Sequence, residues 1–146
     1  SVQEAAKADV VFLAVRWEHV QEVLSAISLE GKILIDVTNA NLPEFVLAES
    51  GSKTSSEVVA QWARGAKVVK AFNTLYAQVL AENPKVGDGN RVIFYSGNND
   101  DAKDVVSGII NRIGFAGVDL GSLNEGGKLQ RFPGGSLSTL NLIKLK

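Results

Sequence analysis

The chain has 146 residues, a formal net charge of −1, no cysteine, no methionine and one histidine, His19. The missing cysteines exclude disulfides, thiolate metal sites and cysteine nucleophiles, and one histidine argues against a multi-histidine metal site. No basic patch points to nucleic acid, and no apolar run has the length of a membrane span, so we expect one soluble, cytoplasmic domain without a metal.

The first predicted strand is Val10–Val15, six consecutive apolar residues after the end of a helix at Glu4–Asp9. Such a run is typical of a parallel strand that is covered on both faces. Arg16 and Trp17 stand at its carboxyl end. A helix should follow, because apolar residues recur at helical spacing, and we expect Gly31 to end it. The apolar residues are Val20, Val23, Leu24 and Ile27.

A second buried strand is predicted at Ile33–Val37, and Thr38–Pro43 forms its polar end. The next segment is a loop with a helical turn expected at 44–48. Thr54 and Glu57 then have the spacing of a capping box, in which each side chain accepts a hydrogen bond from the other residue's backbone. They predict the start of another helix.

The stretch Lys67–Leu75 is the most informative in the chain. Val68–Ala71 reads as a third buried strand, and Phe72-Asn73-Thr74 is a polar turn at its end. In an open α/β sheet, ligands bind just beyond the carboxyl ends of the strands. This turn therefore places an amide, a hydroxyl and an aromatic ring where a ligand would lie.

Strands and helices continue to alternate toward the C-terminus, which predicts an α/β doubly wound fold with a mostly parallel sheet. We expect glycine-rich breaks at 121–127 and 132–135. The remaining expected elements are a helix at Leu75–Ala81, a turn at 87–90, a strand at Arg91–Ser96, a helix through Ile113 that Gly114 ends, a strand at Phe115–Leu120 and a helix beginning near Ser136.

Four polar or aromatic residues follow the three apolar strands: Arg16, Trp17, Asn39 and Asn73. If the strands are parallel, these residues collect along one edge of the sheet. An asparagine amide suits a carboxamide or a ribose, an arginine suits a phosphate, and a tryptophan can stack on a flat ring. The ordinary alternative is that each is a turn, capping or surface residue. The four together favour a binding site, although no G-x-G-x-x-G loop in the right context is present.

With these residues in view, the chain resembles the NADP-binding reductase domain shared by NADPH–deazaflavin (coenzyme F-420) oxidoreductases and the cytosolic domains of six-transmembrane metalloreductases. Of the matching segments, the most specific is the strand-and-turn sequence VVKAFNT. In the family's order, the segments are Val11–His19, Gly31–Asn39, Ala66–Leu75, Val92–Gly97 and Gly114–Leu123.

The resemblance implies a Rossmann-like fold and cofactor-binding roles at three strand ends. Val15, Arg16 and Trp17 match the turn that passes the dinucleotide, and Asn39 matches a position near the nicotinamide half. Ala71, Phe72 and Asn73 match a segment close to the nicotinamide and the second redox ring. The region 121–129 matches a segment that helps to enclose the acceptor coenzyme.

The resemblance further implies a hydride transfer between NADP(H) and a flavin or deazaflavin coenzyme. The alternatives are a non-catalytic nucleotide-binding or interaction module of the same fold, and a stable fragment without activity. The family's first strand, its G-x-G-x-x-G loop, the helix and the second strand have no counterpart here. Residues 1–146 are therefore expected to be a partial NADP-binding Rossmann domain whose strand at Val10–Val15 has an unpaired edge. Small-molecule coenzymes are the expected partners, and a homodimer is left open.

Overall fold

The computed structural model describes residues 1–42 and 53–146, and the helical turn predicted at 44–48 lies outside them. The elements alternate between strands and helices, as the apolar runs predicted. In chain order they are α1 (Val2–Ala5), β1 (Val10–Leu13), α2 (Trp17–Ser25), β2 (Ile33–Asp36), α4 (Ser55–Trp62), β3 (Lys67–Ala71), α5 (Ala77–Leu80), β4 (Lys85–Val86), β5 (Gly89–Gly97), α6 (Asp100–Arg112), β6 (Ala116–Asp119), α7 (Leu123–Leu129) and β7 (Ile143–Leu145).

The strands β1, β2 and β3 are parallel neighbours, with β1 at the edge of the sheet. Their carboxyl ends therefore meet at one edge, which confirms the arrangement on which the predicted site depends. The doubly wound α/β fold with a mostly parallel sheet is likewise confirmed.

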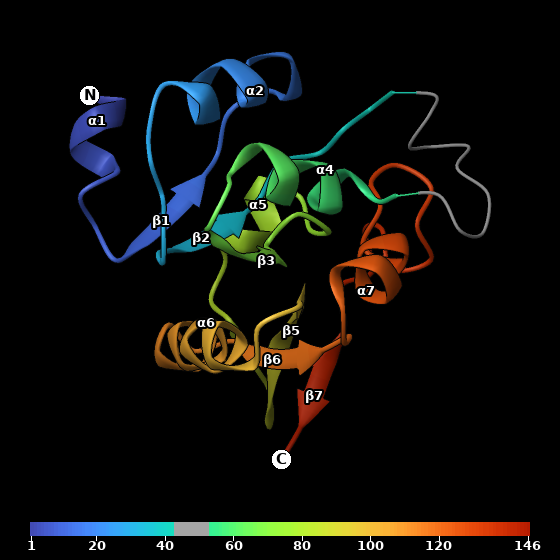
Figure 1. Cartoon of the computed structure of the whole chain (residues 1–146). Helices are drawn as coiled ribbons and strands as arrows, with labels where there is room; N and C mark the ends of the chain where they lie inside the picture. The colour runs from blue at the N-terminus through green and yellow to red at the C-terminus, as the bar shows by residue number, and fades with distance from the viewer. Residues whose placement is uncertain (43–52) are drawn as a thin grey trace.

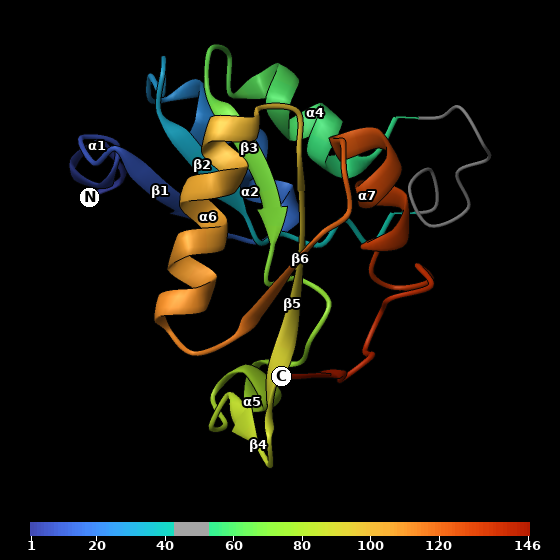
Figure 2. The same ribbon diagram turned by 90° about the horizontal axis from the view of Figure 1, so that it is seen from below.

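The strand β5 runs antiparallel to β3, whereas β6 is parallel to β5. The chain reaches β5 through α5 and a hairpin with β4, instead of through a crossover helix, and a hairpin reverses the direction of the chain. The first half of β5 consequently extends past the end of β3, where β4 and β7 pair with it (Figure 2).

Helices cover the two faces of the sheet unequally. Alternate strand residues point to opposite faces, so that Ile35 and Val69 pack under α6, while Leu34 and Val68 pack against α2, α4 and α7. Figure 1 shows α6 apart from α2, α4 and α7. None of the helices within residues 1–42 and 53–146 is long and apolar enough to cross a membrane.

Two predictions near the helix ends were wrong. The helix α2 ends at Ser25, and Gly31 instead lies in a turn, with φ +72° and its N–H donating to the Gly65 carbonyl at 2.9 Å. No helix begins near Ser136: residues 143–145 form β7, because the projecting half of β5 offers unpaired backbone groups with which they form a ladder.

The glycine-rich stretch at 121–127 contains a helix, α7, where the sequence predicted a break. Its glycines are there for close packing. A Cβ atom on Gly126 would lie 2.3 Å from the Cβ of Ser96 in β5, and one on Gly127 would lie 3.0 Å from the Thr54 side chain. The helix therefore reaches β5 and the start of α4 at backbone distance.

The predicted capping box at the start of α4 is confirmed. The Thr54 hydroxyl accepts the Glu57 N–H at 3.3 Å, and the Glu57 carboxylate accepts the Thr54 N–H at 2.7 Å. The same carboxylate accepts a hydrogen bond from Asn124 of α7 at 3.0 Å. Burial alone would raise the pKa of Glu57, but these hydrogen bonds, together with the charge of Lys128, outweigh burial and hold the pKa below its ordinary value.

We expect Gly126→Ala to destabilise the protein by about 1–3 kcal/mol, since the new methyl group forces α7 away from Ser96. Gly108→Ala is the matched control: Gly108 lies within α6, and nothing approaches its added Cβ within 4 Å. That control should raise stability by about 0.5–1 kcal/mol, because alanine favours helix. Urea unfolding of both variants checks this, and equal effects would contradict it.

Glu57→Gln tests the capping box through pH. The pKa of Glu57 is lowered in the folded state, so its charged form stabilises the fold above the ordinary value of 4.5, and this stabilisation is lost as pH falls through the folded-state pKa. Above that range the variant should be roughly 1 kcal/mol less stable, and the gap should narrow in acid. The exposed Glu22→Gln is the control for unfolding curves recorded between neutral and acid pH.

Candidate functional site

Asn39 and Asn73, predicted from two separate strand ends, are in contact. The Asn73 side-chain N–H₂ donates to the Asn39 side-chain oxygen at 3.0 Å, and the Asn39 side-chain N–H₂ donates to the Asn73 carbonyl at 3.3 Å. The parallel pairing of β2 and β3 brings the residues that follow them together. The two amides thus form a small polar cluster at the carboxyl edge of the sheet.

One acceptor in this cluster has no partner. Asn73 is only 4% exposed, and its Nδ2 is shared between Asn39 and the Gln130 carbonyl, which lies at 2.7 Å. Its Oδ1 atom is buried and accepts no hydrogen bond within the described part of the chain. A buried acceptor without a donor is costly, so this atom has a reason to accept an N–H or O–H from a bound molecule.

An aromatic cleft of about 490 Å³ lies beside the amide cluster. The rings of Trp17 and Trp62 form part of its wall, with centroids 5.5 Å apart and planes tilted by 40°. Arg16, Asn39, Asn41 and Leu42 also line it. Asn39 therefore belongs to both the cleft and the amide cluster, and the cleft brings together Arg16, Trp17 and Asn39 as predicted.

Arg16 and Val15 precede α2 and have different environments. The side chain of Arg16 is 84% exposed, and among the described residues its ion pair is with Glu18, at 3.9 Å. Such a weak surface pair leaves the guanidinium available to an anionic group. Val15 is half-buried and packs into the core beneath α2 and α4, so its side chain has a structural role there.

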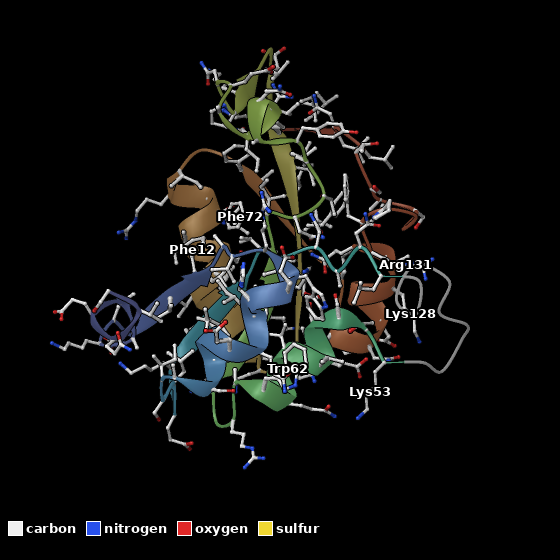
Figure 3. The ribbon with its side chains drawn as sticks, turned by 90° about the horizontal axis from the view of Figure 1, so that it is seen from above. Phe12, Lys53, Trp62, Phe72, Lys128 and Arg131 are labelled. Carbon is white, nitrogen blue, oxygen red and sulfur yellow. The ribbon has the colours of Figure 1, made fainter. Side chains whose placement is uncertain are left out.

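Ala71 and Phe72 lie on the other side of the sheet edge. Ala71 is fully buried in the core under α6. Phe72 also packs there, and its ring centroid is 5.9 Å from that of Phe12, whose side chain is 50% exposed (Figure 3). The seven predicted residues therefore divide between two faces of the sheet, with the amide cluster between them.

The backbone of Phe72 is strained. Its φ of +63° lies in the left-handed region, which a bulky side chain rarely adopts. Strained residues persist where the surrounding structure holds them, and they often occur at functional sites. The turn that directs Asn73 toward Asn39 depends on this conformation.

Gln130, just beyond α7, supports the site although the sequence did not indicate it. Its buried amide donates to the Lys70 carbonyl at 3.2 Å and the Phe94 carbonyl at 3.1 Å, and accepts from the Ser96 hydroxyl at 2.5 Å. It thereby joins β3 to β5, while its own carbonyl receives Asn73. A single glutamine between two glycine-rich stretches has no local pattern that could have revealed this.

A buried ion pair lies beneath the amide cluster and was also missed. Lys70 of β3 is 3% exposed, and its ammonium lies 3.2 Å from the fully buried carboxylate of Asp36, the last residue of β2. The ammonium also donates to the Thr38 carbonyl. The carboxylate accepts from the Thr38 N–H at 2.9 Å, the Thr38 hydroxyl at 2.7 Å and the Ser56 hydroxyl at 2.8 Å.

The amino-acid sequence is similar to those of known proteins. Residues 1–40 match the model of the family described as coenzyme F-420-dependent NADP oxidoreductase. The chain is 35% identical over 126 residues to metalloreductase STEAP3 of Rattus norvegicus, a match that covers 86% of this chain and 25% of the relative. The chain thus spans about a quarter of the length of the curated relatives it matches.

The chain is also similar to solved structures. A hypothetical protein from Sinorhizobium meliloti has a TM-score of 0.88 and 44% identity, over 98% of this chain and 70% of that one. A protein from Arthrobacter sp. FB24, described as an F-420-dependent NADP-reductase, has a TM-score of 0.61 and 26% identity, over 86% of this chain and 60% of that one. The strand ends, the fold and these relatives together support a relationship of the chain to the family of coenzyme F-420-dependent NADP oxidoreductases.

Proposed function

We propose that the protein containing this chain transfers a hydride between NADP(H) and a flavin or deazaflavin coenzyme. The observation that carries the proposal is the buried, unpartnered Oδ1 of Asn73 at the carboxyl edge of the sheet. The carboxamide of a nicotinamide offers the N–H donor that this atom lacks. When bound, the nicotinamide supplies or accepts the hydride, and the protein supplies binding and orientation.

The two parts of the site suit the two ends of such a coenzyme. Asn73, held by Asn39, would accept a hydrogen bond from the nicotinamide carboxamide. The cleft next to it would hold the remainder of the dinucleotide, with Trp17 as an aromatic wall and Arg16 as a cation for a phosphate. Phe72 would bound the nicotinamide side toward α6, with Ala71 packed beneath it in the core.

The acceptor is proposed from chemistry and from relatives. One neighbour, from Arthrobacter, is described by both F-420 and NADP. Flavin and deazaflavin coenzymes carry phosphate groups, and three cationic side chains lie toward the α7 side of the molecule: Lys53, Lys128 and Arg131 (Figure 3). The segment 121–129, expected to enclose the acceptor, includes α7 itself.

We further propose that residues 1–146 are part of an NADP-binding Rossmann domain completed by more chain. Within the described residues β1 pairs only with β2, and Phe12 on its α6 side is half exposed. A further strand beside β1, with a helix over Phe12 and Phe72, would cover this edge. A cytoplasmic location and a homodimer stay predictions.

The test uses the full-length protein with NADPH and, in separate reactions, a flavin and a deazaflavin acceptor. We expect tight NADPH binding by calorimetry and a fall in NADPH absorbance with at least one acceptor. Binding without any oxidation would favour the alternative of a nucleotide-binding module. Absence of NADPH binding would refute the proposal.

Arg16→Ala tests the phosphate contact. We expect the Kd for NADPH to rise about 3–10-fold, and the rise to shrink at high salt as the charge is screened. Arg64→Ala is the control, because Arg64 is also exposed but does not line the cleft. Calorimetry at low and high salt measures both, and equal Kd values for the two variants would exclude Arg16 from the contact.

A further inference from the structure

Lys70 and Asp36 form a buried ion pair that the proposed function does not use. Burying an ammonium and a carboxylate together costs solvation, and such pairs are often no more stabilising than apolar residues of the same size. The Lys70–Asp36 pair lies directly below the amide cluster, at paired positions of β2 and β3. Its location points to a role in the geometry of the site.

The first connection runs through the Lys70 side chain. Its ammonium donates to the Thr38 carbonyl, and Asp36 holds both the N–H and the hydroxyl of Thr38. The N–H, the hydroxyl and the carbonyl of Thr38 are therefore all held by hydrogen bonds. The next residue, Asn39, leaves this turn in one direction, toward Asn73.

The second connection runs through the Lys70 main chain. The Lys70 carbonyl accepts from the Gln130 amide at 3.2 Å, and the Gln130 carbonyl accepts from Asn73 at 2.7 Å. Both acceptors of the Asn73 N–H₂, on Asn39 and on Gln130, are thus held in place by contacts that start at Lys70.

These two acceptors fix the orientation of the buried Asn73 amide. With Asn39 and Gln130 both accepting from Nδ2, the Oδ1 atom must be the free end. If both acceptors moved away, the amide could turn and present its N–H₂ instead. The Asn73 side chain would then offer a hydrogen-bond donor where it now offers an acceptor. The site would favour a ligand group that accepts a hydrogen bond.

We infer that Lys70 is a positioning residue that, through Thr38 and Asn39, keeps Asn73 Oδ1 facing the coenzyme as an acceptor for the nicotinamide carboxamide N–H. This inference rests on the proposed function. It assigns to Lys70 a part in distinguishing a carboxamide from a group of similar shape without an N–H.

The probe is NADP beside its 3-acetylpyridine analogue, in which a methyl group replaces the carboxamide amino group. We expect the full-length wild-type protein to bind the analogue at least about tenfold more weakly, because Asn73 Oδ1 is then left without a donor. Calorimetric Kd values give this ratio directly, without any turnover.

Lys70→Met combined with Asp36→Asn removes the ammonium without leaving a buried, uncompensated carboxylate. We expect the ratio of the two Kd values to fall by about half or more, because Asn73 is then held by the Gln130 carbonyl alone and its Oδ1 is positioned less exactly. Asn39→Ala, which removes one acceptor of Asn73 directly, should have the same effect and serves if the double variant does not fold.

Arg91→Met combined with Glu82→Gln is the matched control. It also removes an ion pair with a buried cation, at 2.8 Å, but in β5 and away from the amide cluster. The control should keep the wild-type ratio of the two Kd values. A fall in the Lys70 variant could then not be attributed to a general loss of stability. A wild-type ratio near one, or an unchanged ratio in the Lys70 and Asn39 variants, overturns the inference. Loss of NADP binding by the wild type itself overturns the proposed function first, and this inference with it.

Discussion

The buried ion pair between Lys70 and Asp36 is the contact on which the ligand edge of the sheet depends. It joins β2 to β3 where both strands end, and every oxygen of the carboxylate has a partner. The loops after these strands carry Asn39 and Asn73, so their separation is set by contacts beneath the surface. A fully satisfied polar network of this kind has one arrangement, which is what a binding site requires.

A second constraint comes from α7, which contacts the sheet at backbone distance. Gly126 allows the helix to lie against Ser96, and this approach places Gln130 between β3 and β5. Gln130 supplies donors to the Lys70 carbonyl of β3 and the Phe94 carbonyl of β5. The C-terminal part of the chain therefore completes the site that the first three strands begin.

The strands and their polar ends were predictable because they depend on local pattern. Continuous apolar runs mark buried parallel strands, and a parallel pair necessarily brings its following residues together, as with Asn39 and Asn73. Trp62 lies at the end of α4, and nothing local in the sequence showed that its ring would meet that of Trp17. Likewise, β7 forms only because β5 projects past β3. The two glycines of α7 are needed only because Ser96 and Thr54 lie too close for a Cβ atom. These features depend on residues far apart in sequence.

The division of the predicted residues between two faces has a physical meaning for the ligand. Trp17 and Trp62 lie on the α2 side, Phe72 and Phe12 lie on the α6 side, and the asparagine pair stands at the edge between them. A small compact ligand could not reach both faces, whereas an extended one can cross the edge with one end on each side. A dinucleotide whose nicotinamide is read at the asparagine pair has this shape, and a second flat ring on the Phe72 side would then face the nicotinamide across the edge.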